Sequence, residues 1–305
     1  MSRPRLVFGA ALAAALLVAC SGGGSAATAA TTAPSRTTAG TSGGGQATAS
    51  ATTAATATSA PAAATTTVHT AVYFLHSGKV SPAARTVTAP QTAAGALRAL
   101  LAGPDAYERA HGRTTAIPSG TTLRSVAVRS RVATVDLSGR YDDGASGASA
   151  RARLAQVVFT VTRFTGIDTV RFALDGRLVT VFGSAHIAVA HPVGRADFEA
   201  QSPAVLVESP LLGDTVTVGS PLRVRGTADT FEAVFRLRLT DRTGRVAADV
   251  RVKATSGTGT RGTFDVTVPL HAPVATGPGT LTAYVVSPED GHRVTVETVP
   301  VTWGR

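Results

Sequence analysis

The stretch AQVVFTVTRFTGIDTVRFALDG, residues 155–176, carries the signals that decide the fold of the first half of this 305-residue chain. Its apolar side chains recur every three or four residues as far as Phe164, which is the spacing of a buried helix face. Gly166 then ends the helix, and an apolar run leads to Asp175-Gly176, a dipeptide that favours a tight hairpin turn. A helix, a strand and a hairpin turn in such close succession predict helices packed against a sheet.

The residues on both sides of this stretch extend the pattern. Apolar residues at helical spacing predict helices over residues 92–102 and about 147–164. Three arginines lie off the apolar face of the second helix: Arg151, Arg153 and Arg163. A short β-rich apolar run predicts a strand over 70–75, and alternating runs predict strands over 122–130 and 131–138. Residues 169–183 are predicted to form a strand, the Asp175-Gly176 turn and a further strand. The order β-α-β-β-α-β-β predicts one α+β domain over residues 68–185, with two helices on one face of a mostly antiparallel sheet.

A different pattern begins after residues 186–203, which contain two X-Pro pairs and are predicted to be a linker. From Ala204 onward no helical period is present, and turns with Gly or Pro separate short alternating runs. The runs cover seven ranges: 204–208, 221–226, 234–239, 248–253, 263–268, 280–286 and 293–301. Seven short strands in about 100 residues predict an all-β immunoglobulin-like sandwich over residues 204–305. Four aromatic residues are candidates for its core: Phe231, Phe235, Phe264 and Tyr284.

The N-terminal segment has the features of a secretory signal. Two arginines precede an uncharged run over residues 6–19, which is shorter than the roughly 20 apolar residues that a membrane-spanning helix needs. The run ends in Leu17-Val18-Ala19-Cys20, which resembles the lipobox of bacterial lipoproteins. The resemblance implies that residues 1–19 are a signal peptide and that Cys20, the only cysteine of the chain, receives a diacylglycerol on its sulfur. The alternative is an ordinary signal peptide with an incidental cysteine.

Residues 20–67, from the lipidated cysteine onward, are predicted to form a disordered tether. Beyond Cys20 almost all of them are Ala, Gly, Ser or Thr, and the exceptions are Pro34, Arg36, Gln46 and Pro61. Such a composition cannot bury enough apolar surface to offset the entropy lost on ordering. We expect the tether to carry the two folded domains away from the membrane surface.

The charge pattern argues against some classes of function. The chain has 29 Lys and Arg residues against 19 Asp and Glu, a net charge of +10. These basic residues form no dense stripe of the kind that binds nucleic acid. The seven histidines are scattered, with no close pair suited to a metal ion. We therefore expect no nucleic-acid partner, no metal and no cofactor.

Two short motifs match catalytic or nucleotide-binding patterns but stand in the wrong context. Residues 40–44, GTSGG, fit the nucleophile elbow, which requires a strand before it and a helix after it, whereas here they lie in the tether. Residues 257–262, GTGTRG, fit GxGxxG, but a predicted strand follows them instead of a helix whose N-terminus binds phosphate. A flexible hairpin loop explains the second motif better.

Residues near predicted turns give further candidates. Asp136 and Asp175 could act as general acid and base only if the fold brings them together, and hydrogen bonding at turns and strand ends is the favoured interpretation. Asp142-Asp143-Gly144 could bind a cation, but a turn that leads to a helix N-terminus explains it more simply. The loop TAIPSGT, residues 115–121, is interpreted as a rigid connector, with a recognition loop as the alternative hypothesis.

Strand alternation in the second domain places Arg236 and Arg238 on one face. Candidate neighbours come from two other predicted strands: Arg223, Arg225, Arg251 and Lys253. An arginine-lined sheet could bind an acidic wall polymer or an acidic protein. A solvated face, balanced by the acidic residues of the same domain, is the favoured interpretation.

Motifs over residues 72–183 resemble the GerMN domain family, which is named from spore germination and sporulation proteins. They occur in the family's order: VYF at 72–74, LLAGP at 100–104, TAIPSGT at 115–121, VATVDLS at 132–138, AQVVFTVTRFTGI at 155–167 and VRFALDG at 170–176. Residues 204–303 are similar to the immunoglobulin-like domain of bacterial spore germination. That similarity rests on four motifs: ESPLLGDTV at 208–216, SPLRVRGTADTFEA at 220–233, DRTG at 241–244 and GTF at 262–264. The resemblance implies an assembly-type module for which no catalytic residue is established.

Together these features predict a non-enzymatic lipoprotein of the cell envelope, anchored to the extracytoplasmic side of the cell membrane through acylated Cys20. We expect its two domains to bind an envelope protein partner or to self-assemble. The alternative is a lipoprotein that binds peptidoglycan or a wall polysaccharide. A wall hydrolase that uses Asp136 and Asp175 is a third hypothesis.

Overall fold

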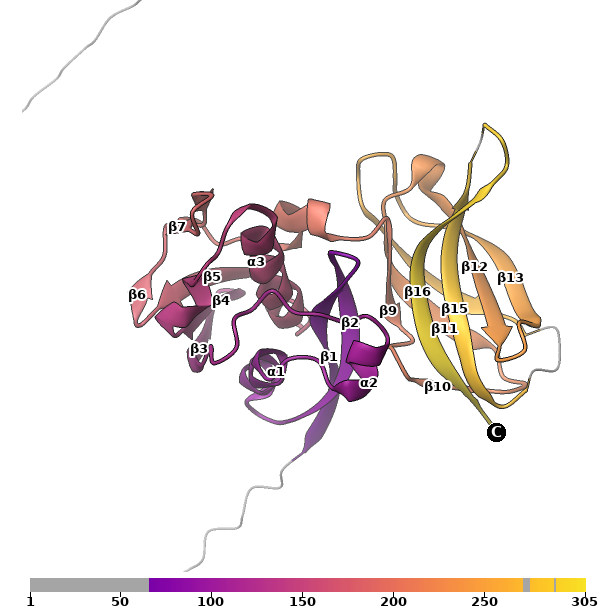
Figure 1. Ribbon diagram of the computed structural model, residues 1–305, viewed down its shortest axis with the longest axis horizontal. Helices are drawn as coiled ribbons and strands as arrows, with labels where there is room; N and C mark the ends of the chain where they lie inside the picture. Colours follow the sequence, from indigo (N-terminus) through magenta and orange to yellow (C-terminus); the bar gives the residue numbers. More distant parts are fainter. Residues whose placement is uncertain (1–65, 271–274, 288) are drawn as a thin grey trace, which may run out of the picture. The chain divides into compact units, whose positions relative to one another are not determined.

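The computed structural model describes residues 66–270, 275–287 and 289–305 of the chain, and these residues belong to one compact unit (Figure 1). The predicted signal peptide at 1–19, Cys20 and the GTSGG motif at 40–44 lie outside the described residues, as does nearly all of the predicted tether. In the part of the chain that the structure describes, no helix is long and apolar enough to cross a membrane.

The first domain begins with a β-hairpin. Strand β1 (Thr67–His76), which contains the strand predicted over 70–75, pairs antiparallel with β2 (Lys79–Thr88). Ser77 and Gly78 make the turn between them with positive φ angles of 50° and 76°. The sequence does not predict β2, because Pro82 and its neighbouring small residues interrupt the alternation that marks a strand.

A second sheet of this domain has the strand order β3-β4-β5-β6. Its strands are β3 (Leu123–Arg129), β4 (Val132–Leu137), β5 (Thr169–Leu174) and β6 (Arg177–Leu178). β3 and β4 form the predicted hairpin, but β4 and β5 run parallel. Helix α3 (Gly147–Val161) follows β4 and the short 3-10 helix η1 (Gly139–Asp142), and it provides the crossover that a parallel pair requires. The α+β class is confirmed, with the correction that the strands form separate sheets.

Helices α1 (Thr92–Leu101) and α3 pack against β1 and against each other, and both fall where the sequence predicts them (Figure 1). A short helix α2 (Ala106–Ala110) follows α1. Arg153 of α3 corrects the predicted helical face, because it is 4 % exposed and lies on the buried side. Its guanidinium donates hydrogen bonds to the carbonyl oxygens of Ala116, Tyr141 and Asp143, which compensate for the burial of the charge.

Residues 186–203 differ from the predicted linker. They contain β8 (Ile187–Ala188), which pairs with β7 (Val181–Phe182), and the 3-10 helix η2 (Arg195–Gln201). Four apolar side chains of this segment are buried in the core of the first domain: Ile187, Val189, Val193 and Phe198. The segment is therefore packed onto the first domain, beside α3, instead of connecting two domains freely.

The second domain is a sandwich of two sheets with the strand orders β10-β16-β15-β12-β13 and β14-β11-β9 (Figure 1). Its strands are β9 (Val205–Ser209), β10 (Thr215–Thr217), β11 (Leu222–Ala228), β12 (Val234–Asp241), β13 (Val246–Lys253), β14 (Gly262–Val268), β15 (Gly277–Val286) and β16 (Arg293–Gly304). All seven predicted strands are present, and β10 is the addition. The predicted immunoglobulin-like architecture thus agrees with the structure.

The core of the sandwich contains two of the four predicted aromatic residues. The rings of Phe235 and Phe264 meet edge to face with centroids 4.9 Å apart, and the buried Trp303 belongs to the same hydrophobic core. Phe231 was expected in the core but is 68 % exposed, because it lies in the 3-10 helix η3 (Phe231–Ala233), outside the alternation of any strand. Tyr284 is buried, but it lies on the outer face of the five-stranded sheet, opposite Arg236 in the pairing of β12 with β15.

Polar side chains connect the two domains. Tyr73 of β1 donates its hydroxyl hydrogen to Glu208 of β9, and Arg195 of η2 pairs with the same carboxylate at 2.8 Å. Farther along this junction, Arg113 of the first domain and Glu297 of β16 are 2 % and 7 % exposed. Within the described ranges, Nε of Arg113 and Oε1 of Glu297 have no hydrogen-bond partner. The junction therefore holds one satisfied carboxylate and one that is only partly satisfied.

Candidate functional site

The fold brings Asp136 and Asp175, the predicted acid–base pair, to one turn region. Asp136 accepts a hydrogen bond from the backbone N–H of Gly176 at 3.0 Å, and Asp175 accepts one from Gly139 at 3.0 Å. The guanidinium of Arg124 lies 3.4 Å from Asp136 and 3.7 Å from Asp175. Both carboxylates therefore stabilise turns through hydrogen bonds, in agreement with the interpretation that they have a structural role.

The loop at residues 115–121 is held against α3. Gln156 accepts hydrogen bonds from the backbone N–H of Ala116 at 2.8 Å and from the hydroxyl of Thr115 at 3.3 Å. Arg153 donates to the carbonyl of Ala116 at 3.0 Å. These bonds from two buried side chains agree with a rigid connector.

The remaining sequence motifs also have structural roles. Residues 257–262 connect β13 to β14, so a strand follows the GxGxxG pattern and no helix begins there. Asp142 accepts a hydrogen bond from the backbone N–H of Gly183 at 3.0 Å, in the turn that precedes α3. Among the residues described by the structure, no group of three or more His, Cys, Asp or Glu side chains could hold a metal ion.

The outer face of the five-stranded sheet gathers cations from β12 and β13. Arg236 lies directly opposite Arg251 in the antiparallel pairing, and Val234 lies opposite Lys253. Because directly opposite residues share a face, Arg236, Arg251 and Lys253 lie together, as the alternation predicts. Arg238, two residues after Arg236, lies on the same face. The fold thus brings these four cations together, as it does Asp136 and Asp175.

The other two candidate arginines lie elsewhere. Arg223 and Arg225 belong to β11 in the three-stranded sheet, so the expectation that they lie near Arg236 is wrong. Alternation along one strand does not say which of the two sheets that strand joins. Arg223 instead forms an ion pair with Asp265 on the neighbouring strand β14.

Asp249 is the acidic centre of the cationic face. It accepts hydrogen bonds from Arg236 at 2.9 Å, from Arg238 at 2.5 Å and from the hydroxyl of Tyr284 at 2.8 Å. Burial alone would raise the pKa of Asp249, but the hydrogen bonds from Arg238, Tyr284 and Arg236 hold it below its ordinary value. The guanidinium of Arg293 lies 5.4 Å from the centre of the Tyr284 ring, a cation–π distance. Asp249 is thus ionised and already engaged by three neighbours.

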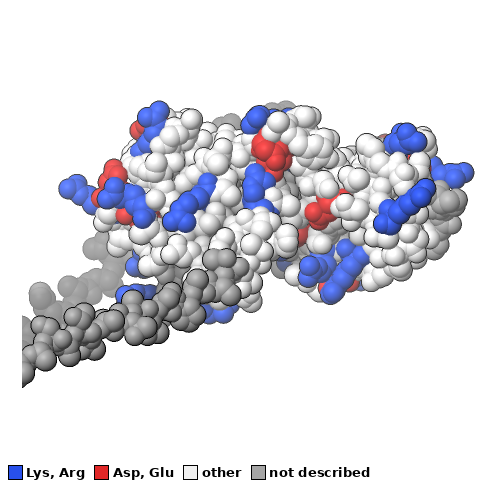
Figure 2. Space-filling model, turned by 90° about the horizontal axis from the view of Figure 1, so that it is seen from below, with Lys and Arg blue, Asp and Glu red and all other residues white. Residues whose placement is uncertain are grey.

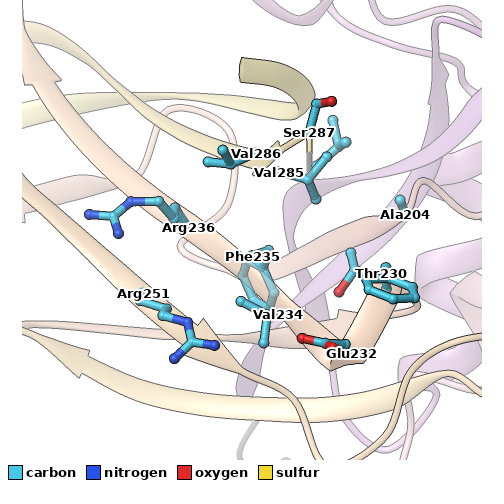
Figure 3. A pocket seen from close by; sticks show the side chains of 12 residues that line it. Ala204, Thr230, Glu232, Val234, Phe235, Arg236, Arg251, Val285, Val286 and Ser287 are labelled. Carbon is cyan, nitrogen blue, oxygen red and sulfur yellow. The ribbon is translucent and has the colours of Figure 1, made fainter. Parts of the chain in front are cut away.

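An apolar pocket of about 560 Å³ adjoins this face (Figure 3). Arg236 and Arg251 lie on one side of the pocket in Figure 3, and Thr230 lies on the opposite side. The apolar part of the lining comes mainly from β12 and β15: Val234, Phe235, Val285 and Val286. A cavity of this size and polarity falls within the range of ligand-binding pockets, roughly 300–1,000 Å³.

The sequence reasoning above missed two features of this site, Asp249 and Thr230. Asp249 alternates with Arg251 and Lys253 along β13, so the strand period contains a signal for it that the charge pattern alone does not reveal. Thr230 gives no such signal, because it lies in a loop and is buried only by the fold.

On the face of the molecule drawn in Figure 2, cations are dispersed. In the view of Figure 2, Lys and Arg side chains are separated by neutral residues, and acidic side chains lie among them. That face therefore lacks the continuous basic stripe that phosphate backbones require.

Comparison with known families identifies both domains. Residues 71–180 match the family Germane, described as "Sporulation and spore germination". Residues 204–292 match the family Gmad2, described as "Immunoglobulin-like domain of bacterial spore germination". No curated protein matches the chain.

Solved structures are similar to parts of the chain. The first GerMN domain of the sporulation protein GerM from Bacillus subtilis is 19 % identical with a TM-score of 0.35, and the match covers 43 % of this chain and 99 % of that one. The tandem GerMN domains of the same protein are 17 % identical with a TM-score of 0.36, covering 61 % of this chain and 60 % of that one. Fibronectin(III)-like modules of CbhA from Clostridium thermocellum are 20 % identical with a TM-score of 0.20, covering 32 % of this chain and 93 % of that one.

Proposed function

Because this chain carries a Germane domain followed by a Gmad2 domain, we propose that it is a lipid-anchored protein of the cell envelope that acts by binding and not by catalysis. The tandem of two domains named from sporulation and spore germination carries the proposal. The lipobox at Leu17-Val18-Ala19-Cys20 supports the anchor, since a diacylglycerol gives the two buried chains that stable membrane attachment needs.

The contacts of the candidate catalytic residues support a binding role. One carboxylate oxygen of Asp136 accepts the backbone N–H of Gly176, and one of Asp175 accepts that of Gly139. Both carboxylates therefore stabilise turns, which supports a structural role for them. The cationic face and the apolar pocket of the second domain provide a surface suited to a partner.

The anchor is tested by replacing Cys20 with Ala in the full chain and fractionating the cells that produce it. We expect the wild-type chain in the membrane fraction and Cys20→Ala in the soluble extracytoplasmic fraction. Ser21→Ala, one residue beyond the acylated position, is the matched control and should stay with the membrane. Retention of Cys20→Ala in the membrane fraction would contradict the lipid anchor.

The binding role is tested by crosslinking in living cells, followed by identification of the trapped molecule. We expect an envelope protein or a second copy of this chain. Crosslinks to peptidoglycan alone, together with salt-resistant co-sedimentation of the full chain with purified cell wall, would replace the proposal with a wall-binding function.

A further inference from the structure

The edge of the five-stranded sheet beside the cationic face is open. The strand order ends at β13, and within the described ranges no strand pairs with its outer side. An edge strand directs the N–H and C=O of every second residue away from the sheet, and an extended peptide can bind them by adding as a further strand. β13 therefore offers backbone hydrogen bonds to an extended segment.

Two cations of the edge strand itself, Arg251 and Lys253, lack counter-charges among the described residues. Arg236 and Arg251 lie directly opposite each other, an arrangement that destabilises a sheet when both carry the same charge. Asp249 is the only carboxylate on this face of the paired segments of β12 and β13, and Arg236, Arg238 and Tyr284 already engage it. Arg251 and Lys253 are exposed and make no hydrogen bond or ion pair with the residues that the structure describes. An acidic side chain on a partner would relieve this imbalance.

The pocket beside these cations supplies an apolar contact and one unsatisfied polar group. Phe231 and Val286, which line the pocket, are 68 % and 47 % exposed. Thr230 is 6 % exposed, yet its hydroxyl has no hydrogen-bond partner among the described residues. Burying a hydroxyl without a partner costs free energy. A ligand group that reaches Thr230 would therefore form the hydrogen bond that this hydroxyl lacks in the free protein.

The rim of the pocket carries an acidic residue, Glu232, as well as the cations. Glu232 lines it as well, from a residue with a positive φ of 55°, and Ala233 beside it has a φ of 60°. Non-glycine residues in this region of backbone conformation are strained, and such strain clusters at binding sites. The Glu232 carboxylate repels an acidic group, so the acidic residue of a partner belongs at Arg251 and Lys253, on β13.

We propose that the outer edge of β13 and the adjoining pocket bind an extended acidic segment of a partner protein, with an apolar side chain in the pocket and a carboxylate at Arg251 and Lys253. An anionic wall polymer would satisfy the cations, but it has neither an apolar side chain for the pocket nor a peptide backbone for the strand edge. The inference rests on the proposed binding function and names the class of partner.

The test is selection of a random octapeptide library, displayed on phage, against the purified full chain. We expect the enriched peptides to be rich in Asp and Glu and to contain an apolar or aromatic residue in a fixed spacing to the acids. A fluorescent copy of the most enriched peptide then gives dissociation constants for variants. Arg251→Glu and Lys253→Glu should each weaken binding at least tenfold, and Phe231→Ala at least fivefold.

Arg225→Glu is the matched control, because it makes the same change at an exposed arginine of the same domain but in the other sheet. We expect it to change the dissociation constant less than twofold. Fluorescence of Trp303, the only tryptophan of the chain, verifies that each variant is folded. The two charge reversals are independent, so that one remains informative if the other fails to fold.

Three results would overturn the proposal. The enriched peptides could show no acidic bias, they could bind Arg251→Glu and Lys253→Glu as tightly as the wild type, or sodium polyphosphate could bind as tightly as the peptide while Phe231→Ala has no effect. The last result would mean a simple anion-binding surface. None of them bears on the membrane attachment of Cys20, so failure of this inference and failure of the anchor are distinguishable.

Discussion

Two glutamates at the junction of the domains show how differently one side chain can behave when it is buried. Glu208 of β9 accepts a hydrogen bond from Tyr73 and pairs with Arg195 at 2.8 Å, and a second arginine, Arg163, lies 3.8 Å away. Glu297 of β16 has an oxygen without a partner among the described residues, and the only cation that acts on its pKa is Arg113. Burial is common to both, but charge compensation is not.

The contrast appears in the two pKa values. Burial raises the pKa of Glu208, but Arg195 and the hydroxyl of Tyr73 more than offset that effect and bring it below its ordinary value. Burial raises the pKa of Glu297 from 4.5 to about 7, and Arg113 offsets only part of the increase. At a pH above the pKa that Glu208 has in the unfolded chain, its ionised carboxylate therefore stabilises the fold. This stabilisation is lost as the pH falls through the lower pKa of Glu208 in the folded protein. Ionised Glu297 instead costs stability.

The largest effect is expected from Glu208→Ala, which removes the acceptor and leaves Arg195 without its carboxylate. Breaking a buried ion pair in this way costs about 3–5 kcal/mol. The measurement is urea unfolding at pH 7, followed by Trp303 fluorescence for the second domain and by far-ultraviolet circular dichroism for both. If Glu208 couples the domains, the two transitions coincide in the wild type and separate in the variant.

Glu199→Ala is the control for that experiment. Glu199 pairs with Arg261 at 2.7 Å, but its side chain is 43 % exposed, so we expect a loss of about 1 kcal/mol or less. Equal losses for Glu208→Ala and Glu199→Ala would show that compensation at the junction does not depend on burial.

The second prediction concerns Glu297→Gln. Below pH 4.5 the carboxyl is protonated in both states, so the variant and the wild type should be equally stable. Between pH 4.5 and about 7 the folded wild type holds a proton that the unfolded chain releases, so its stability falls as the pH rises. Above pH 7 the variant should be the more stable by at most about 3.5 kcal/mol, since each pKa unit corresponds to about 1.4 kcal/mol.

Urea midpoints at pH 4, 6 and 8 test this sign. The difference between Glu297→Gln and the wild type should be absent at pH 4 and largest at pH 8. A difference that is constant over this range, or one that favours the wild type at pH 8, would show that Arg113 compensates Glu297 fully.

The sequence predicts the local elements of this fold well and the junction poorly. The helix over 92–102 and the seven strands of the second domain follow from periodicity, because each needs only neighbouring residues. Strand alternation even places Glu297 on the same side as Val299 and Val301, which marks it as an acid that faces the core. Its neighbour Arg113 lies far away in the sequence, and no local pattern indicates that the two meet.

The same limit applies to the candidate binding surface. Arg251 and Lys253 can be placed on one face with Arg236 from the alternation of two strands, and the structure agrees. The pocket could not be predicted, since β12, β15, β16 and η3 contribute to it and their arrangement depends on the whole sandwich. Phe231 illustrates the difficulty, because composition favours burial and the fold leaves it exposed.

Tyr73→Phe is expected to change the free energy of unfolding less than Glu208→Ala or Glu297→Gln does. The variant removes one hydrogen bond to Glu208 but leaves the pair with Arg195, and a hydrogen bond to a charged group contributes about 2 kcal/mol. Urea unfolding at pH 7 measures the loss. Tyr107→Phe is the matched control: Tyr107 is 46 % exposed, and we expect no measurable change. A loss for Tyr73→Phe as large as that for Glu208→Ala would mean that the hydroxyl, and not Arg195, compensates the carboxylate.

The smallest loss of stability is expected from Asp168→Asn, which removes an ion pair between an arginine and a carboxylate on the surface. Arg131 and Asp168 form an ion pair at 2.5 Å, shorter than the 2.8 Å between Arg195 and Glu208, but their side chains are 61 % and 55 % exposed. Water and salt screen exposed charges, and holding two long side chains in place costs entropy, so exposed pairs contribute little. Asp168→Asn should therefore leave the urea midpoint at pH 7 unchanged within error, in low salt and in 1 M NaCl. If it lowered the midpoint as much as Tyr73→Phe does, contact distance and not burial would set the strength of these pairs, and the contrast between Glu208 and Glu297 would need another explanation.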